Sequence, residues 1–188
     1  MSETKKISKE TTATLSMDAE AIRKAIRRIA HEIIERHPEL SQLVILGIPT
    51  HGVEVAKRLV KYIAEIEKVE PSFGVLDISM HRDDLSTRGR MTAIQETQLP
   101  LDLDNRNVIL VDDVLFTGRT CRAAMDALSS FGRPLRIELA VLVDRGHREL
   151  PIRADYVGKN LPTSREEKIS VRFENTDGVA DSVSVLKS

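Results

Sequence analysis

The stretch Val108-Ile-Leu-Val-Asp-Asp-Val-Leu-Phe-Thr-Gly-Arg-Thr120 decides the fold of this 188-residue chain. Its first four residues form an apolar run that is typical of a strand buried on both faces of a parallel sheet. Asp112 and Asp113 follow this run, where ligands bind in open α/β sheets. Residues 117–120 then open a helix, whose free backbone N–H groups suit a phosphate. The stretch therefore predicts a phosphate-binding and sugar-binding site at the end of a central strand.

The adjacent carboxylates of Asp112 and Asp113 suit a sugar diol and Mg²⁺, because they accept hydrogen bonds and bind hard cations. An apolar strand that ends in Asp-Asp is also typical of a Walker B strand. That interpretation requires a Walker A loop, but Gly47-Ile-Pro-Thr-His-Gly52 is followed by Val53-Glu54 instead of Lys-Ser/Thr. The sequence also has no Gly-x-Gly-x-x-Gly motif. It therefore favours neither a nucleoside triphosphatase nor a dinucleotide-binding protein.

Helical and strand patterns alternate along the chain, which predicts an α/β fold with a mostly parallel, twisted sheet and helices on both faces. Residues 1–16 are polar and predict a flexible tail, and residues 17–188 predict a single domain. The polar stretch 81–100 has no persistent period and predicts a lid, a binding loop or a disordered segment. We expect helices over 18–36, 53–68 and 120–131, and strands over 43–46, 73–79, 107–111, 135–141, 154–158, 169–173 and 182–186.

Composition limits the classes of partner. With 28 Lys and Arg against 29 Asp and Glu, the net charge of −1 excludes a uniformly basic surface but allows a local basic face. Aromatic residues make up 3%, which disfavours a base-stacking sheet. The single cysteine, Cys121, allows no internal disulfide, and we interpret it as a small packed residue. The polar N-terminus and the short apolar runs predict a cytoplasmic protein with no membrane partner.

The quoted stretch resembles the phosphoribosyl pyrophosphate (PRPP) signature of type I phosphoribosyltransferases. Arg82-Asp-Asp-Leu-Ser86 and the segment from Val143 to Asn160 are similar to one family within that class, and the similarity covers residues 18–175. This is the PyrR family, whose members are bifunctional pyrimidine operon attenuation regulators and uracil phosphoribosyltransferases. The resemblance implies a type I phosphoribosyltransferase fold with a small hood and a mobile lid loop. It also implies that uracil and PRPP react, with Mg²⁺ as cofactor, to give UMP and pyrophosphate.

The resemblance also assigns the active-site residues. It implies that Asp112 and Asp113 hold the ribose hydroxyls and Mg²⁺, and that Arg82 in the lid is a third catalytic residue that contacts phosphate. Residues 144–146 and 160–162 should form the hood that receives uracil. The implied PRPP-binding and nucleotide-binding residues are Thr50, His51, Gly52, Asp112, Asp113, Val114, Leu115, Phe116, Thr117, Gly118, Arg119, Thr120 and Arg145.

One position departs from the family pattern. The pyrophosphate loop of the family carries Thr-Arg-Gly, and this chain has Thr50-His51-Gly52. Arginine is always charged and offers a bidentate fork to phosphate, whereas histidine is mostly neutral near pH 7 unless its pKa is raised. We therefore expect weaker PRPP or pyrophosphate binding and reduced catalysis. The alternative is that the backbone N–H groups of the loop hold the anion without the side chain.

A basic stripe follows one face of the first predicted helix, opposite its isoleucines. Such a stripe is also typical of a solvated helix face. The resemblance implies that it belongs to a concave basic face, which binds a stem–loop of pyr leader mRNA more tightly when UMP is bound. We expect Arg148→Ala to weaken this binding and to spare PRPP turnover. The candidate RNA-binding residues are Lys24, Arg27, Arg28, His31, Arg36, Arg148, Arg153 and Lys159.

Three functions remain open at this stage: the bifunctional regulator, a dedicated uracil salvage enzyme without RNA binding, and a purine phosphoribosyltransferase. The segment 144–160 and the basic stripe disfavour the purine enzyme. His51 favours a regulator over an efficient enzyme. The resemblance further implies a homodimer or a tetramer.

Overall fold

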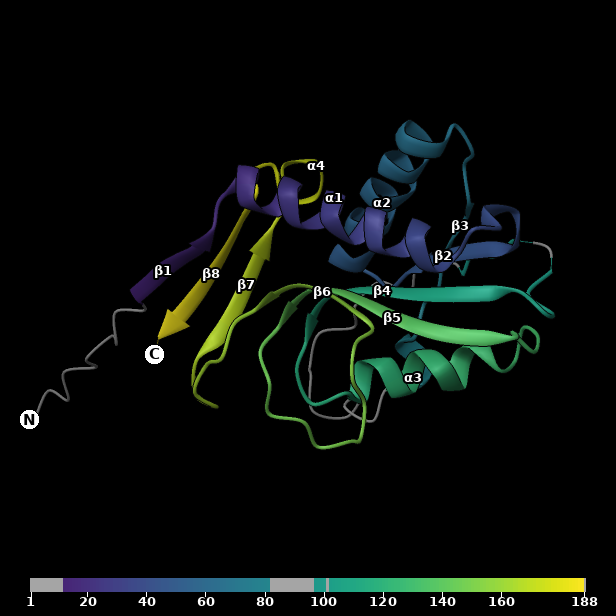
Figure 1. The fold of residues 1–188 in the computed structure, drawn as a ribbon. Helices are drawn as coiled ribbons and strands as arrows, with labels where there is room; N and C mark the ends of the chain where they lie inside the picture. The colour runs from purple at the N-terminus through teal and green to yellow at the C-terminus, as the bar shows by residue number, and fades with distance from the viewer. Residues whose placement is uncertain (1–11, 82–96, 101, 188) are drawn as a thin grey trace, which may run out of the picture.

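The computed structural model describes residues 12–81, 97–100 and 102–187. Within these residues, five strands form a parallel sheet in the order β3-β2-β4-β5-β6 (Figure 1). This arrangement confirms the predicted α/β fold with a parallel sheet. The strands are β2 (Leu43–Gly47), β3 (Ser72–Val75), β4 (Asn107–Leu115), β5 (Arg136–Asp144) and β6 (Tyr156–Asn160).

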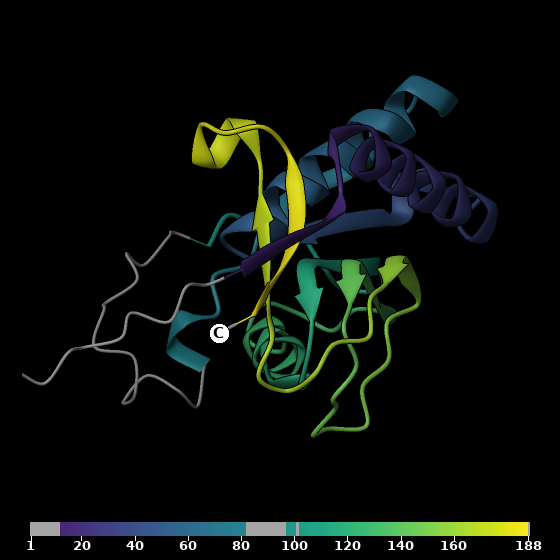
Figure 2. The ribbon, with the colours of Figure 1, turned by 90° about the vertical axis from the view of Figure 1, so that its left-hand side faces the viewer.

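Helices cover both faces of this sheet, as the sequence predicts. The helices α1 (Ala19–Arg36) and α2 (His51–Glu67) lie on one face, and α3 (Arg119–Leu128) lies on the other (Figures 1 and 2). Ile109 in β4 packs into the core under α1 and α2, while its neighbour Leu110 packs into the core that includes α3. Both faces of the strand are therefore apolar, which explains why β4 has no polar alternation.

A second, smaller sheet is antiparallel and has the order β1-β8-β7. It contains β1 (Thr12–Met17), β7 (Lys168–Arg172) and β8 (Ser182–Lys187), and the short helix α4 (Glu174–Asp177) connects β7 to β8. We refer to this sheet and α4 as the hood. The residues that the resemblance assigns to a hood, 144–146 and 160–162, lie instead at and beyond the ends of β5 and β6. Met17 and Val183 of the hood join the core under α1, so the hood packs against the main body.

The prediction of a flexible tail over residues 1–16 is wrong for its last part. Residues 12–16 belong to β1, where Thr12 pairs with Lys187 of β8. The sequence did not predict this strand because it lacks an apolar pattern. Backbone pairing with β8 and the burial of Met17 stabilise it instead. Residues 1–11 lie outside the described residues.

The stretch 81–100 is described only at its two ends, beside the short helical turn η2 (Ser79–His81). The backbones of Val75 and Gln98 exchange two hydrogen bonds, of 2.7 and 2.9 Å, so the two ends meet beside β3. Residues 82–96 lie outside the described residues, and the predicted lid and Arg82 fall among them. Among the described helices, none has the length and apolar character needed to cross a membrane.

Candidate active site

Residues 116–120 comprise the turn after β4 and the first two residues of α3, and they include the predicted phosphate-binding residues 117–120; we refer to them as the phosphate loop. Gly118 has a φ of 94°, in the left-handed region that favours glycine, and it caps the N-terminus of α3. The carbonyl oxygen of Thr117 accepts hydrogen bonds from the backbone N–H groups of Glu149 and Leu150, at 3.0 and 3.2 Å. Residues 149 and 150 therefore hold the loop in place by hydrogen bonds. The N-terminus of α3 lies at the end of the loop, and a helix N-terminus is a suitable site for an anion.

Asp112 and Asp113 lie inside β4, which continues to Leu115 rather than ending at Val111 as predicted. Each carboxylate accepts one backbone hydrogen bond: Asp112 from the N–H of Asp113 at 2.9 Å, and Asp113 from the N–H of Val114 at 2.8 Å. Both residues are half-buried. Each carboxylate is thus held by the backbone at one oxygen, and the pair remains accessible to a ligand.

The predicted pyrophosphate loop lies directly against this acid pair. The backbone N–H of Ile48 donates to the carbonyl oxygen of Val111 at 2.9 Å. A Cβ atom added to Gly52 would lie 2.5 Å from that same oxygen and 2.9 Å from the Cα of Asp112. Only glycine allows so close an approach. The structure therefore brings residues 50–52 and Asp112 together, as the resemblance implies.

His51, the first residue of α2, lies between two carboxylates. Its Nδ1 is 3.3 Å from Oδ2 of Asp113, and its Nε2 is 3.0 Å from Oδ2 of Asp177. The hydrogen bond with Asp113 raises the pKa of His51 above its ordinary value of 6.5; burial opposes this shift and Asp177 adds to it. The two carboxylates thus favour the protonated imidazole and oppose the neutral form that histidine ordinarily adopts near pH 7.

Sequence reasoning did not find Asp177. It lies at the end of α4 in the hood, far along the chain from the PRPP signature. No local pattern around it distinguishes it from the other acidic residues of the C-terminal part. Only the packing of the hood on α2 brings it to His51.

Arg145 is buried between the phosphate loop and residues 163–167. Its guanidinium donates to the Thr163 hydroxyl at 3.0 Å and to the carbonyl oxygens of Ser164 and Glu167, each at 2.8 Å. It also lies over the ring of Phe116, 4.1 Å from the centroid. Burial lowers the pKa of Arg145. Its position joins residues 163–167 to the phosphate loop, and the expectation that Arg145 contacts the nucleotide stays a prediction.

Arg148 lies against the phosphate loop as well. It donates to the carbonyl oxygens of Phe116 at 2.8 Å, of Gly146 at 3.1 Å and of Ile152 at 2.9 Å, and it pairs with Asp144. This contact with the phosphate loop gives Arg148 a second expected role, in supporting that loop, beside the predicted RNA contact. The sequence shows that this residue is positively charged, but it does not show that the side chain bonds to Asp144, Gly146 and Ile152 of its own loop.

The other predicted RNA-binding residues lie on α1 and near the edge strand β6. Arg28 donates to the carbonyl oxygens of Val157 and Gly158 at 2.9 and 2.8 Å, and Lys159 donates to that of Ser16 at 2.7 Å. Arg36 approaches Asp155 at 3.6 Å. These three side chains are nevertheless exposed to solvent, and Lys24, which approaches Glu20 at 3.3 Å, is exposed as well. The other exposed members of the set are Arg27, His31 and Arg153.

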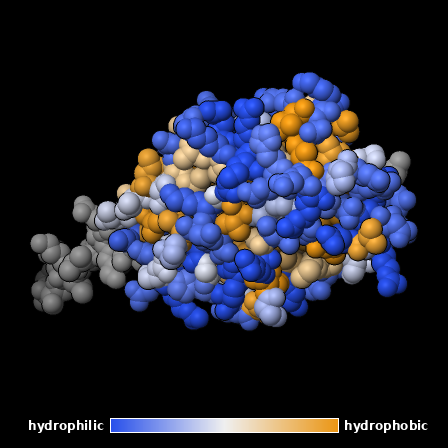
Figure 3. All heavy atoms as spheres, in the orientation of Figure 1, coloured by the Kyte–Doolittle hydropathy of each residue, from blue (hydrophilic) through white to orange (hydrophobic). Residues whose placement is uncertain are grey.

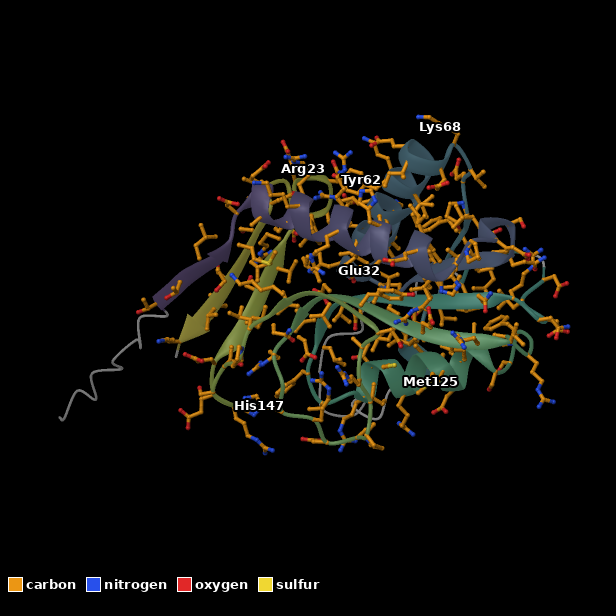
Figure 4. All side chains as sticks on the ribbon, viewed as in Figure 1. Arg23, Glu32, Tyr62, Lys68, Met125 and His147 are labelled. Carbon is orange, nitrogen blue, oxygen red and sulfur yellow. The ribbon has the colours of Figure 1, made fainter. Side chains whose placement is uncertain are left out.

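Two figures show the surroundings of these cations. Hydrophilic side chains cover much of the face that carries α1 (Figure 3). Arg23 and Glu32 lie on α1 on one side of the parallel sheet, whereas His147 lies on the loop at the opposite side (Figure 4). The edge strand β6 connects these two sides, since its Lys159 reaches Ser16 just before α1 and its Val157 and Gly158 accept from Arg28 of α1.

The carboxylates of Asp112 and Asp113 fit a Mg²⁺ ion that is bound jointly by the protein and by a phosphate ligand. Among residues 12–81, 97–100 and 102–187, no three His, Cys, Asp or Glu side chains are grouped as a metal site. Mg²⁺ commonly takes one or two carboxylates and completes its shell with phosphate oxygens and water. Asp112 and Asp113 could supply those carboxylates.

Comparisons with known proteins agree with this geometry. The phosphoribosyl transferase domain family matches residues 17–174. A hypoxanthine-guanine phosphoribosyltransferase from Bacillus anthracis superposes with a TM-score of 0.68 at 17% identity, covering 92% of this chain and 98% of that one. The Trypanosoma cruzi hypoxanthine phosphoribosyltransferase, solved with its product IMP, gives 0.68 at 18% identity, covering 92% and 89%. The fold and the site thus define a type I phosphoribosyltransferase.

Sequence relatives narrow this class. "Bifunctional protein PyrR" of Roseiflexus sp. (strain RS-1) is 54% identical over 172 residues, which are 92% of this chain and 94% of the relative. The protein of the same name from Deinococcus radiodurans is 58% identical over 162 residues, covering 86% and 88%. The chain belongs to the PyrR family.

Proposed function

We propose that this protein transfers the phosphoribosyl group of PRPP to uracil, forming UMP and pyrophosphate, and that it regulates the pyr operon by binding leader mRNA. The observation that carries the enzymatic part is the convergence of three features at the carboxyl ends of β2 and β4. These are the Asp112–Asp113 pair, the N-terminus of α3 and the loop 50–52. Sugar, 5′-phosphate and pyrophosphate each have a matching group there.

The reaction displaces pyrophosphate at the anomeric carbon of ribose. It needs accurate positioning of the two substrates, stabilisation of the leaving group and exclusion of water. In the proposal, Asp112 and Asp113 orient the ribose hydroxyls, the backbone N–H groups at the start of α3 bind the 5′-phosphate, and residues 50–52 receive the pyrophosphate. Mg²⁺, when bound with PRPP, neutralises charge on the leaving pyrophosphate. Arg82 is proposed as a further phosphate contact.

The regulatory part rests on different residues. The exposed cations Lys24, Arg27 and His31 supply a basic strip on α1, and phosphate contacts of this kind are the main source of affinity for nucleic acids. The word "bifunctional" in the names of the relatives supports a second activity. Because mRNA and PRPP are cytoplasmic partners, we infer that the protein acts in the cytoplasm, as a homodimer or a tetramer.

One observation favours the alternative, a salvage enzyme without RNA binding. Arg28, Arg36 and Lys159 all contact groups within the protein, so fewer free cations face solvent than the sequence predicts. Intramolecular contacts of exposed cations are weak, however, and RNA phosphates can compete for them. Whether the exposed cations of this set bind RNA therefore distinguishes the regulator from the salvage enzyme.

A substrate comparison tests the enzymatic part. Purified protein with PRPP and Mg²⁺ is given uracil or hypoxanthine, and UMP or IMP is measured; sedimentation gives the oligomeric state. We expect UMP from uracil, no IMP from hypoxanthine, and loss of UMP formation in Asp112→Asn/Asp113→Asn. IMP formation would support the purine enzyme instead. Binding of leader RNA, with and without UMP, separates the regulator from the salvage enzyme.

A further inference from the structure

His51 connects the PRPP site to the hood. One ring nitrogen faces Asp113 of β4 and the other faces Asp177 of α4, at 3.3 and 3.0 Å. The ring also meets the ring of Phe173 edge to face, with centroids 5.8 Å apart. Because both nitrogens and one edge of the ring have partners, the orientation of the imidazole is set from both sides.

Asp177 is itself held firmly. Its Oδ2 accepts the backbone N–H of Phe173 at 2.8 Å, and its Oδ1 accepts from Arg172 at 3.1 Å. Its side chain is 13% exposed. A carboxylate with fixed donors on both oxygens keeps its place, so it is a rigid support for the histidine.

The contact also fixes Asp113. Oδ1 of Asp113 accepts the N–H of Val114, and Oδ2 faces His51. Without a partner on Oδ2, the carboxylate is held at one oxygen alone and can rotate. The orientation of the Asp113 carboxylate, which is proposed to bind ribose, thus depends through His51 on Asp177 of the hood.

We propose that Asp177 is a positioning residue of the PRPP site, which holds the His51 imidazole against Asp113 and makes the hood a part of the PRPP-binding machinery. This inference rests on the proposed function, since it takes PRPP as the ligand. The role is one of positioning, because Asp177 reaches the ligand site through His51.

The same segment provides a matched control. Asp181 pairs with Arg58 of α2 and accepts the backbone N–H of Glu174 at 2.9 Å. Its side chain is 12% exposed, so it is as enclosed as Asp177. Asp181 therefore anchors the segment to the same helix, through Arg58 instead of His51.

The test compares Asp177→Ala, Asp181→Ala, His51→Ala and the double variant His51→Ala/Asp177→Ala. For each we measure KM for PRPP, KM for uracil, kcat and the thermal midpoint. We expect Asp177→Ala to raise KM for PRPP about tenfold, the scale of one charge-assisted hydrogen bond, with KM for uracil changed less than about twofold. Asp181→Ala should lower the thermal midpoint about as much as Asp177→Ala does, but its KM for PRPP should stay within about twofold of the wild-type value. In the His51→Ala background, loss of Asp177 should add nothing.

Asp177→Asn refines the test and replaces the alanine variant if that variant does not fold. Its amide oxygen still accepts a hydrogen bond from His51 but carries no charge, so we expect an intermediate rise in KM for PRPP, of about threefold. An unchanged KM for PRPP in an active Asp177 variant, or equal effects of Asp177→Ala and Asp181→Ala, would overturn the inference alone. Absence of UMP formation by the wild-type protein would overturn the proposed function, and the inference with it.

Discussion

Arg148 donates a hydrogen bond of 2.8 Å to the carbonyl oxygen of Phe116, and this contact ties the basic loop 144–153 to the phosphate loop. Two further carbonyl oxygens of the basic loop, those of Gly146 and Ile152, accept from the same guanidinium. The side chain thus organises the turn that precedes α3. A cation that the sequence assigns to RNA is, in the folded protein, also bonded to the backbone of the phosphate loop.

Arg148→Ala should therefore lower kcat/KM for PRPP by about tenfold or more, because three carbonyl oxygens lose a charged donor. Steady-state UMP formation measures this. Arg153→Ala, which removes an exposed cation from the same loop, is the control and should leave turnover unchanged. Unchanged turnover in Arg148→Ala would restore the earlier expectation that this residue is separate from the PRPP site.

Gly52→Ala should abolish UMP formation and lower the free energy of unfolding. The added Cβ would lie 2.5 Å from the carbonyl oxygen of Val111, closer than real Cβ contacts allow, so α2 must move away from β4. Chemical unfolding and the UMP assay check the two effects. Lys57→Ala, an exposed substitution on the same helix, should change neither, and an active, stable Gly52→Ala protein would contradict this packing.

His51→Arg should raise kcat/KM for PRPP. The guanidinium is always charged and can meet Asp113 and the ligand anion with separate donors, whereas both nitrogens of the imidazole already face the carboxylates of Asp113 and Asp177. PRPP saturation curves of the two proteins test this. If kcat/KM does not rise, the loop holds pyrophosphate through its backbone and the side chain at this position is not limiting.

Arg27→Ala should weaken binding of pyr leader RNA while UMP formation stays unchanged. Each phosphate contact that is lost should reduce the slope of log affinity against log salt by about 0.7–0.9. Filter binding over a range of salt concentrations gives this slope. Lys57→Ala on α2 removes the same charge from another helix and should not alter it; equal effects of the two variants would indicate only a general charge effect.

Glu138 predicts a pH-dependent stability. It is buried in β5, 2.7 Å from Nε2 of His37, and accepts a hydrogen bond of 2.8 Å from the hydroxyl of Tyr156. Burial raises the pKa of Glu138, but the hydrogen bonds with His37 and Tyr156 outweigh burial and hold it below the ordinary 4.5. Since the folded-state pKa is lowered, the stabilisation is complete above about pH 4.5 and is lost as pH falls through the lowered value.

Glu138→Gln should accordingly lower the free energy of unfolding by about 1–3 kcal/mol at pH 7, and the difference from wild type should narrow below about pH 4.5. Urea unfolding between pH 7 and pH 3 measures this difference. Glu166→Gln, at an exposed position, serves as the control. A difference that stays constant over this range would show that Glu138 does not titrate as described.

The comparison of sequence with structure separates local from long-range information. The apolar run 108–111 and the glycine at 118 predicted β4, the phosphate loop and the start of α3, because strand burial and helix capping depend on neighbouring residues. Cys121 was also interpreted correctly: it is buried, and burial raises the pKa of its thiol to about 11. Strand β1 was missed, because its pairing with β8 leaves no local pattern.

The candidate site was predictable in its ligand-binding core and not in its supports. Asp112, Asp113 and Gly52 come together because the ends of neighbouring parallel strands meet. Asp177 and the internal contacts of Arg148 depend on packing between distant segments, which residue type alone does not reveal. The sequence therefore indicated which residues bear charge, and the fold determined which partners they take.

The most direct measurement of the two-function proposal is the dissociation constant of pyr leader RNA with and without UMP, for wild type and for Asp112→Asn/Asp113→Asn. We expect UMP to tighten RNA binding by wild type at least about fivefold, the lower end of typical coupling between two sites. The double variant should bind RNA with an affinity that UMP does not change, because its ribose-binding carboxylates are gone. Equal affinity with and without UMP, in a wild-type protein that forms UMP, would contradict the coupling of enzyme and regulator in this chain.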